Sequence, residues 1–399
     1  MDVNFRVAIV GGGSSTHLLA PLLASQGVEV SILTSRPNDW NNEVSCLYCD
    51  DSNEIQSEIM GTIEAVSDKA KDIIPYVDAI LLCMPVYAYR DALKDLAPHI
   101  KGDKKVFIGT VYGQGGFDWM LKEAFGDLAA RKVIGFAVGL LPWICRIKEY
   151  GKIGITYGPK DKNVVALTEK EEFDNLNDKL LKKMSLSYFG SGQFYLAENF
   201  ISLTLSVDNQ IIHPSRCFAL SNSTPQGWDE NSIPYFYRDF DDKSALVLKY
   251  LDDEFSSIRK AINGISSDNY EYMLDYLSLE RFSYGSFNTD IKESFVSSKT
   301  LGAILPPVKL LKGSYFLDKD HRFFVDDINY GLCIAKWFGA RLNIDTPAID
   351  EIIAWASDLK GLNVPDFITN SLSDEDAEKY GMPTCYGINS LNEALGILA

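Results

Sequence analysis

The chain has 399 residues, of which 46% are hydrophobic, and this is enough for two domains with their own cores. Its 55 acidic and 38 basic residues give a formal net charge of −17, which disfavours nucleic acids and anionic membrane surfaces as partners. No apolar run approaches the roughly 20 residues that cross a bilayer, and the first strand begins close to Met1, so we expect a cytoplasmic protein without a signal peptide.

The chain opens with a short apolar strand, Arg6–Val10, which ends in three glycines and leads into a helical pattern that runs to Ala24. Glycines in such a turn let the backbone approach a pyrophosphate, which the helix N-terminus then holds. A second apolar run, Val28–Leu33, follows at strand–helix–strand distance. The pattern predicts a dinucleotide site, and a purely structural glycine turn is the alternative. The predicted cofactor contacts are Gly11, Gly13, Ser14, Ser15 and Thr16.

Thr16 stands where this fingerprint usually has a third glycine or alanine. This departure implies either looser packing of the helix on the strand or a hydroxyl that is offered to phosphate.

The end of the second strand indicates which dinucleotide is bound. An acidic residue there selects the free 2′-hydroxyl of NAD, whereas arginine and small hydroxyl residues suit the 2′-phosphate of NADP. Here Thr34, Ser35 and Arg36 occupy the place and no carboxylate does. NADP is therefore mildly favoured over NAD, and a solvated loop arginine is the alternative.

Further apolar runs in the first half continue the alternation of strands and helices. Val77–Met84 is largely apolar, as expected of a parallel strand that is covered on both faces. Residues 43–66 alternate weakly and are predicted to add strands at the edge. The other predicted strands are Lys105–Thr110, Lys132–Gly139, Lys152–Tyr157 and Met184–Phe189. We therefore predict a doubly wound α/β domain over residues 1–188.

Two loops follow the carboxyl ends of these strands, the edge at which this fold binds its ligands. Pro85 begins one loop and is a predicted cofactor contact. Gln114 lies in the glycine-rich loop Gly113–Phe117 and is a predicted substrate contact. Cys46 and Cys49 form a CxxC pair, but there is no second pair for zinc, and neighbouring aspartates raise a thiol pKa, so ordinary reduced thiols and no metal are expected.

The second half, residues 189–399, is predicted to be a mainly α-helical domain. Its apolar residues recur with helical period in Tyr250–Ile265, Tyr270–Arg281, Gly331–Leu342 and Ala348–Leu359. A cleft between the two domains is the expected place for a substrate.

His213 is the histidine most suited to chemistry. It lies four residues after Asn209, so both share one face of a predicted helix, and Pro214 is expected to present the imidazole at a bend. By itself this pattern is balanced between a buried structural histidine and a catalytic one. The other three histidines are His17 beside the glycine turn, His99 at a surface helix end and His321 in a polar loop.

The sequence resembles the opine dehydrogenases of the octopine dehydrogenase type over nearly its whole length. The resemblance implies a Rossmann-type domain followed by a helical substrate domain, and an enzyme that condenses an amino acid with a 2-oxo acid, often pyruvate, using NAD(P)H. The matching stretches are 11–13 with His17, 141–151 (LPWICRIKEYG), 209–214, 322–327 and 386–391.

The resemblance also implies the catalytic residues. It places the acid–base histidine on His213, its partner carboxylate on Asp327 and the arginine for the keto acid on Arg322. Histidine titrates near neutrality, a carboxylate fixes its tautomer, and a guanidinium matches a substrate carboxylate. Asn209 is expected to orient the substrate. The alternative is that Arg322 and Asp327 simply pair with each other on the surface.

The amine substrate is predicted not to be arginine. Members of the family that use arginine carry an acidic residue two positions before Leu-Pro-Trp, where this chain has Gly139, followed by Leu140. An unpaired guanidinium there would cost several kcal/mol. Asp275 is the candidate for a substitute carboxylate. Gln114, Gly139, Trp143 and Asp275 are accordingly expected at the substrate site together with Asn209.

Alternatives to an opine dehydrogenase are a 2-oxo acid or 2-hydroxy acid dehydrogenase without an amine co-substrate, and a non-catalytic NADP-sensing protein. Metallophore synthesis by a related branch would need a large amine, and no residue supports it. The expected partners are small molecules, and the chain is expected to be a monomer or a homodimer.

Overall fold

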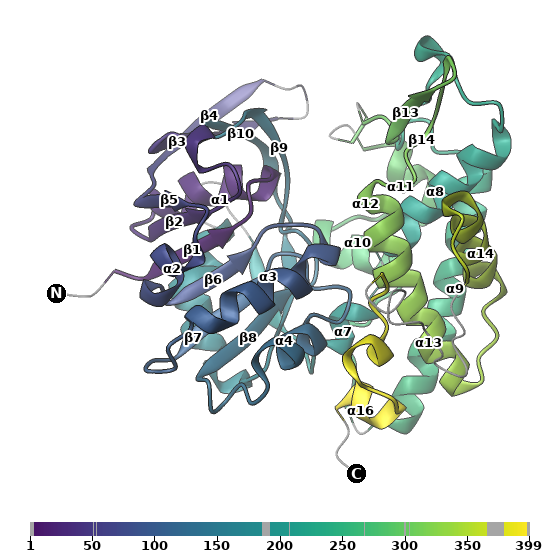
Figure 1. Ribbon diagram of the computed structural model, residues 1–399. Helices are drawn as coiled ribbons and strands as arrows, with labels where there is room; N and C mark the ends of the chain where they lie inside the picture. The colour runs from purple at the N-terminus through teal and green to yellow at the C-terminus, as the bar shows by residue number, and fades with distance from the viewer. Residues whose placement is uncertain are drawn as a thin grey trace. The chain divides into compact units, whose positions relative to one another are not determined.

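The computed structural model describes residues 4–50, 52, 54–185, 192–206, 208–266, 268–298, 301–302, 304–364 and 379–396. The chain divides into two compact units, Met1–Leu203 and Thr204–Ala399, coloured purple to teal and teal to yellow in Figure 1. The first is a mixed α/β domain and the second is mainly helical, which confirms the predicted fold class.

The first unit is built on an eight-stranded sheet. Six neighbouring strands, from β8 to β5 in the order below, run parallel, and the last two at the other edge run antiparallel to them. The strands in spatial order are β12 (Gln193–Leu196), β11 (Lys162–Leu167), β8 (Val133–Val138), β7 (Val106–Thr110), β6 (Ala79–Leu82), β1 (Arg6–Val10), β2 (Glu29–Leu33) and β5 (Ala65–Ser67). The apolar runs of the sequence therefore predicted the parallel strands correctly.

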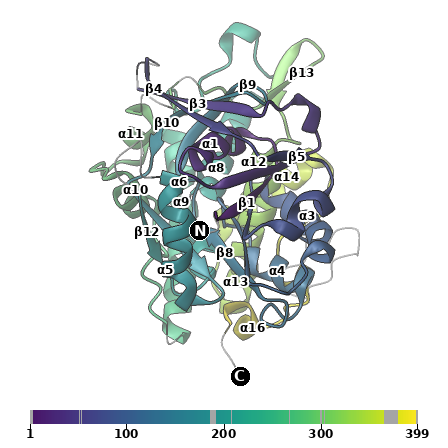
Figure 2. The same cartoon turned by 90° about the vertical axis from the view of Figure 1, so that its left-hand side faces the viewer.

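A second sheet, absent from the sequence prediction, covers helix α1 (Ser14–Ala24). Its strands in spatial order are β4 (Ile55–Thr62), β3 (Glu43–Cys49), β10 (Ile153–Pro159) and β9 (Trp143–Glu149). Figures 1 and 2 show these strands over α1, on the side away from the main sheet. Of the edge strands predicted within 43–66, only β5 joins the main sheet, and the strand predicted at Lys152–Tyr157 belongs to the second sheet.

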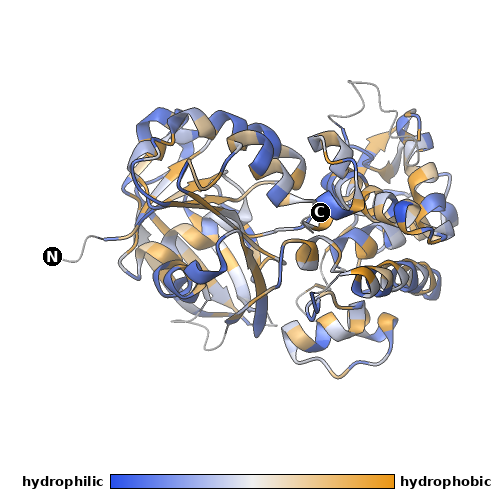
Figure 3. Cartoon of the chain, turned by 90° about the horizontal axis from the view of Figure 1, so that it is seen from below, coloured by the Kyte–Doolittle hydropathy of each residue, from blue (hydrophilic) through white to orange (hydrophobic). Residues whose placement is uncertain are grey.

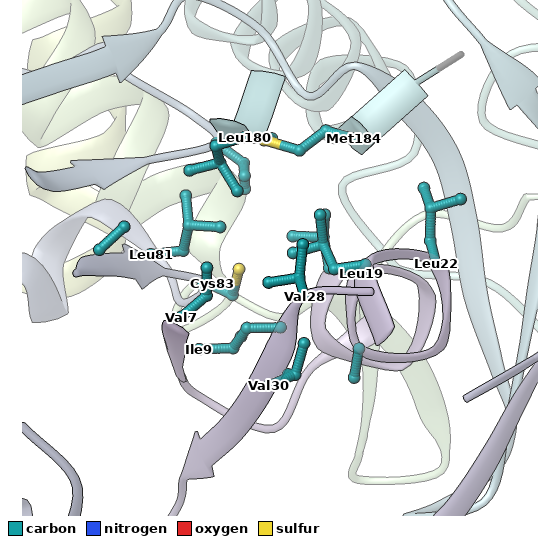
Figure 4. Close-up of a cluster of buried hydrophobic side chains, with 14 of the residues drawn as sticks. Val7, Ile9, Leu19, Leu22, Val28, Val30, Leu81, Cys83, Leu180 and Met184 are labelled. Atoms are coloured by element: carbon teal, nitrogen blue, oxygen red, sulfur yellow. The ribbon is translucent and has the colours of Figure 1, made fainter. Parts of the chain in front are cut away.

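Helix α1 is apolar on all sides because it is enclosed between the two sheets. Every residue from Thr16 to Leu23 is buried, and such a helix has no solvent face to keep polar. Figure 4 shows Leu19 and Leu22 of α1 packed with Val7, Ile9 and Leu81 of the main sheet. Leu180 and Met184 cover the same face, whereas α3 (Tyr89–Leu96) and α4 (Phe117–Phe125) cover the other.

Two boundaries differ from the prediction. Lys182–Ser185 is a helix, α6, so the strand predicted from Met184 is wrong at its start, and residues 186–191 lie outside the described residues. The first unit extends to Leu203 rather than to 188, because β12 pairs with β11 of its sheet. The remaining helices of this unit are α2 (Ala70–Ile73), α5 (Phe173–Leu176) and α7 (Ile201–Thr204), which reaches into the second.

The second unit is mainly helical, and α8 packs against α9 within it. Figure 3 shows hydrophobic and hydrophilic colours alternating along its helices. Its helices are α8 (Asn209–Ser223), α9 (Asp242–Ile265), α10 (Tyr276–Tyr284), α11 (Ile291–Val296), α12 (Arg322–Phe324), α13 (Cys333–Leu342), α14 (Pro347–Lys360) and α16 (Leu391–Leu395). A hairpin of β13 (Val308–Leu311) and β14 (Ser314–Leu317) adds the only sheet found here among the described residues.

Helical periodicity located α9, α13 and α14 but misplaced the start of α10. Residues 270–275 were predicted to be helical, yet α10 begins at Tyr276 because Asp275 is its N-cap and accepts the backbone N–H of Ser278. Between α12 and α13 the chain forms a π-helix, Val325–Leu332, a rare geometry that is frequent at functional sites. No helix in the described ranges combines the length and hydropathy of a membrane span.

His17 joins the two sheets of the first unit. Its Nδ1 lies 2.8 Å from the Gly13 carbonyl and its Nε2 lies 2.7 Å from the backbone nitrogen of Gly151. Nδ1–H therefore donates and Nε2 accepts, so the ring is neutral. Burial lowers the pKa of His17, although the hydrogen bond to Gly13 raises it.

We expect His17→Ala to lower the free energy of unfolding by about 1–3 kcal/mol at pH 7.5, because Gly151 loses a buried acceptor. The folded-state pKa is below that of the unfolded chain, so the wild type loses stability as pH falls below about 6.5. The difference between wild type and variant should therefore shrink at pH 5.5. Urea unfolding at both pH values measures it, with His99→Ala as the control, and a difference that does not change with pH would contradict the neutral, buried His17.

Candidate functional site

The glycine turn after β1 is shaped by packing at two positions and open at the third. Gly11 has a φ of 123°, and a Cβ there would collide with the carbonyl oxygen of Cys83. A Cβ on Gly12 would lie 2.5 Å from the hydroxyl oxygen of Tyr150. Gly13 is exposed, and a Cβ there would lie 3.9 Å from its nearest neighbour, the carbonyl oxygen of Cys83. Of the three glycines, Gly13 alone faces open space.

Gly13 is also the N-cap of α1, and this end of the helix suits an anion. No side chain caps it, and its first turn contains no acidic residue. Ser14 and Ser15 are only half-buried, so their backbone N–H groups and the positive end of the helix dipole can meet a pyrophosphate. The residues present therefore fit a dinucleotide.

Thr16 has a different position from the other predicted cofactor contacts. It is fully buried, and its hydroxyl donates a hydrogen bond of 3.1 Å to the carbonyl of Gly11. The hydroxyl is thus occupied inside the turn and is not exposed to a phosphate, which leaves a role different from the two that the sequence suggested.

Arg36 lies just beyond β2, as predicted, but it is already paired. Its Nε lies 2.6 Å from Oδ2 of Asp39, and its guanidinium carbon lies 3.9 Å from the centre of the Tyr150 ring. Both charged side chains are about half-exposed. Ser35 is exposed, whereas Thr34 is buried and its hydroxyl accepts the Arg36 backbone N–H at 3.4 Å.

The segment 141–151, which carried much of the family resemblance, supports the glycine turn. Tyr150 stands between Gly12 and Arg36, and Gly151 donates to His17. Ser15 is hydrogen-bonded to the thiol of Cys145. The indole N–H of Trp143 donates to the Met184 carbonyl at 2.8 Å, and the side chain is buried, so its contacts are those of a core residue.

The other substrate and loop residues predicted in the first unit lie at strand ends. Gly139 follows β8, donates its N–H to Val164 and packs against Leu203. Gln114 is buried, and its Oε1 accepts the Tyr112 hydroxyl at 2.6 Å. Pro85 follows β6 and lies two residues after Cys83, whose carbonyl is beneath Gly11. Cys46 and Cys49 are buried in β3 without a disulfide.

In the second unit, His213 of α8 and Asp327 of the π-helix form a buried pair. Nδ1 of His213 lies 2.7 Å from Oδ2 of Asp327, and neither residue exposes more than 2% of its surface. The alternative in which Asp327 pairs with Arg322 on the surface is therefore wrong. Burial of a charge in this way requires a hydrogen-bonded partner.

The local sequence explains how the pair forms across 114 residues. Gly331, one turn after Asp327 on the π-helix, faces Gln210 of α8, and a Cβ on Gly331 would lie 2.5 Å from the Cβ of Gln210. The absence of that Cβ lets the two helices approach closely. α8 itself continues through Pro214 to Ser223, so Pro214 does not end the helix.

Arg322 stands beside the pair and is available to an anion. In the part of the chain that the structure describes, it forms no ion pair. Its guanidinium carbon lies 5.1 Å from the ring centre of Phe323, and the residue is half-buried. Its positive charge acts on His213 and on Asp327 alike.

The electrostatics of the pair follow from burial. Burial lowers the pKa of His213 well below its usual range, Arg322 lowers it further, and Asp208 raises it. Burial raises the pKa of Asp327 to about 7, and Arg322 opposes this. Because one hydrogen bond joins the two groups, their protons titrate as a pair. In the deprotonated pair, a neutral His213 donates Nδ1–H to the carboxylate and keeps Nε2 as an acceptor.

Tyr237 was missed by the sequence analysis and completes the site. Its hydroxyl lies 3.0 Å from Nε2 of His213. No periodicity marks this residue, because it lies in an irregular segment between α8 and α9. Arg216, a buried residue of α8 that was also missed, donates hydrogen bonds to the carbonyls of Phe236 and Asp239 in that segment.

The remaining predicted residues of this unit differ in their surroundings. Asn209 is half-buried and lies one turn before His213 in α8, as predicted. The carboxylate of Asp275 accepts both the N–H and the hydroxyl of Ser278 and so serves as a helix cap. His321 caps α12, and burial lowers its pKa to about 4, so it stays neutral.

Comparison with known proteins places this arrangement among related chains. Residues 196–360 match the family described as NAD/NADP octopine/nopaline dehydrogenase, alpha-helical domain. Octopine dehydrogenase from Mizuhopecten yessoensis is 27% identical over 98% of this chain and 99% of its own length. Tauropine dehydrogenase from Arabella iricolor is 24% identical over 98% and 99%. Solved structures of octopine dehydrogenase with NADH and either L-arginine or pyruvate are 23% identical over 99% of both chains, with TM-scores of 0.82 and 0.79.

We expect Asp327→Leu to lower the free energy of unfolding by about 1–3 kcal/mol, because Nδ1–H of His213 then has no buried acceptor. Urea unfolding followed by tryptophan fluorescence measures this. Asp320→Leu, at an exposed position nearby, is the control and should change stability by less than about 0.5 kcal/mol. Equal effects of the two substitutions would contradict the buried pair.

Proposed function

We propose that the chain is an oxidoreductase of the opine dehydrogenase family, which acts on CH–NH donors, and that it condenses an amino acid or similar amine with a 2-oxo acid such as pyruvate, using NAD(P)H. The observation that carries the proposal is the buried His213–Asp327 pair with Arg322 beside it, a cation that has no ion-pair partner among the described residues. These three residues supply a proton, hold the group that supplies it and offer a cation to a carboxylate.

The chemistry assigns one role to each residue. The amine adds to the keto carbon of the 2-oxo acid and gives a carbinolamine, whose oxygen must leave as water. Protonated His213 provides the proton for that oxygen, and Asp327 stabilises the imidazolium through Nδ1–H. Arg322 pairs with the carboxylate of the 2-oxo acid. Bound NAD(P)H supplies the hydride that reduces the resulting iminium carbon.

The dinucleotide contacts proposed are Gly13, Ser14 and Ser15 at the start of α1, on a turn shaped by Gly11 and Thr16. Thr34, Ser35, Arg36 and Pro85 are proposed to contact the rest of the cofactor. We also propose a mild preference for NADP over NAD. Arg36 supports it as a cation for the 2′-phosphate, whereas the ion pair of Arg36 with Asp39 opposes it. An exposed pair contributes at most about 1 kcal/mol, so a 2′-phosphate can replace Asp39. The ratio of kcat/KM for NADPH and NADH measures this preference.

The amine is proposed to be small or apolar, as alanine is, or anionic at its far end, as taurine is. Two observations support this. Gly139 and Leu140 are buried and offer no carboxylate to a guanidinium. Asp275, the substitute considered from the sequence, is occupied as the cap of α10.

The test is consumption of NADH and of NADPH by the purified protein with pyruvate and, in parallel, alanine, glycine, taurine and arginine. Oxidation that requires both pyruvate and an amine supports the proposal. Oxidation without amine would instead indicate a simple 2-oxo acid reductase, and cofactor binding without oxidation would indicate a sensor. Arginine as the best amine would overturn the proposed substrate class, and Asp208, whose charge acts on His213, would be the carboxylate to replace next.

We expect His213→Ala to lower kcat by roughly 100-fold to 10,000-fold, the range for a lost general acid–base group. NAD(P)H binding should stay intact, because the glycine turn and His213 belong to different units. Steady-state kinetics and a cofactor titration measure the two effects. His99→Ala is the matched control, and a folded His213→Ala enzyme with near-normal kcat would contradict the assignment.

The two directions of the reaction should depend on pH in opposite ways. Burial raises the pKa of Asp327 to about 7, so the pair gains its second proton below this pH and loses it above. Condensation needs the proton and should slow as pH rises through about 7, whereas opine oxidation needs the deprotonated pair and should accelerate. Profiles of kcat in both directions measure this. If kcat changed with pH in the same sense for condensation and for opine oxidation, the prediction would be contradicted.

A further inference from the structure

His213 has no ring atom that is open to a ligand. It exposes 1% of its surface. Nδ1 is bonded to Asp327 and Nε2 to the Tyr237 hydroxyl, at 2.7 and 3.0 Å. The Phe323 ring is stacked on one face, with centres 3.5 Å apart and planes 16° apart. A proton that leaves Nε2 therefore meets the oxygen of Tyr237 first.

Tyr237 is held in place by two neighbouring rings and is more accessible than the histidine. It exposes 8% of its surface. Its ring is stacked at 5.7 Å on Phe295 and meets the edge of Phe236 at 4.9 Å. A phenol hydroxyl has one proton to give and lone pairs to accept with, so it can accept from Nε2 while it donates onward.

Arg216 fixes the segment that carries Tyr237. It is buried on α8, three residues after His213, so histidine and tyrosine are positioned from the same helix. Its guanidinium donates to the carbonyls of Tyr235, Phe236 and Asp239, at 3.2, 3.0 and 2.6 Å. It also bonds to Asp241 and Ser244 at the start of α9, at 3.0 and 3.1 Å. Such a fully bonded buried cation rigidifies what it holds.

We propose that Tyr237 is a catalytic residue that passes the proton between Nε2 of His213 and the oxygen of the substrate. The inference rests on the proposed function and deepens it. His213 is then the proton reservoir, and the tyrosine hydroxyl is the group that touches the carbinolamine. This accounts for a histidine that is buried on all sides.

The step balances without a further reactant. The carbinolamine oxygen takes the phenol proton as its C–O bond breaks, and the bonding pair stays on the oxygen, which leaves as water. The phenol oxygen takes the proton of Nε2, so Tyr237 ends neutral and His213 ends as neutral imidazole. The nitrogen lone pair of the amine forms the C=N bond of the iminium. In opine oxidation the same protons move in reverse.

The variant that tests this is Tyr237→Phe, which removes the hydroxyl and keeps the ring and its stacking. We expect kcat for condensation to fall by about 100-fold, within the range of general acid–base groups, with the KM of pyruvate and the affinity for NAD(P)H little changed. Tyr235→Phe is the matched control. It lies in the same segment, and its ring contact with Arg238, at 3.4 Å, does not involve the hydroxyl. Its kcat should equal that of the wild type.

Proton inventories distinguish a relay from a structural hydroxyl. If two protons move in one step, a plot of wild-type kcat against the fraction of D₂O should be curved. The same plot for the residual kcat of Tyr237→Phe should be a straight line. The double variant His213→Ala/Tyr237→Phe should be no slower than His213→Ala, because the two residues act as one unit.

The outcomes separate this inference from the function on which it rests. Wild-type oxidation that does not require an amine overturns the proposed function. Given amine-dependent oxidation, a kcat of Tyr237→Phe equal to or above that of the wild type overturns the relay. A linear proton inventory of the wild-type enzyme would also overturn the relay, and this measurement does not depend on a variant that folds.

Discussion

The hydrogen bond between His213 and Asp327 is the constraint on which the second unit depends. It joins α8 to a π-helix 114 residues later, inside the protein, where a charge without a partner would cost several kcal/mol. The close approach needs a glycine at 331, and Asp327 and Gly331 both lie on the π-helix. One contact therefore joins the packing of two helices to a pair of titratable groups.

In each unit a buried polar side chain holds an irregular segment. In the first unit, His17 bonds to the carbonyl of Gly13 and to the N–H of Gly151 and so ties the glycine turn to the second sheet. In the second unit, Arg216 bonds to the carbonyls around Tyr237. Both side chains meet backbone groups that a loop leaves without partners, and loops fixed in this way can present functional groups with little freedom.

The sequence predicted what depends on periodicity and missed what depends on tertiary contact. Long apolar runs identified the parallel strands, because a strand that is buried on both faces needs apolar residues throughout. The 3.6-residue period identified α9 and α14, because a helix that is buried on one face repeats its apolar residues with that period. Strands were predicted within 43–66 and at Lys152–Tyr157, but the sheet that they form was missed, because β3 pairs with β10 across a long stretch of chain and no local pattern records such a pairing. Asp275 was taken as helical, although an Asp before a helix is equally a cap. No sequence pattern marks Tyr237. Arg216 holds its segment through backbone carbonyls, which every residue has, so this contact leaves no trace in the sequence around Tyr237.

The segment 141–151 carries a conspicuous family motif, but its described contacts are structural and not catalytic. Trp143 packs in the core, Cys145 meets Ser15, and Tyr150 and Gly151 support Gly12 and His17. These are contacts with the dinucleotide turn, and they need the same residues whatever amine is used. Gly139, beside the motif, adds no charge. The motif therefore belongs to the packing of the glycine turn in the first unit, whereas His213, Asp327 and Tyr237 form their buried cluster in the second.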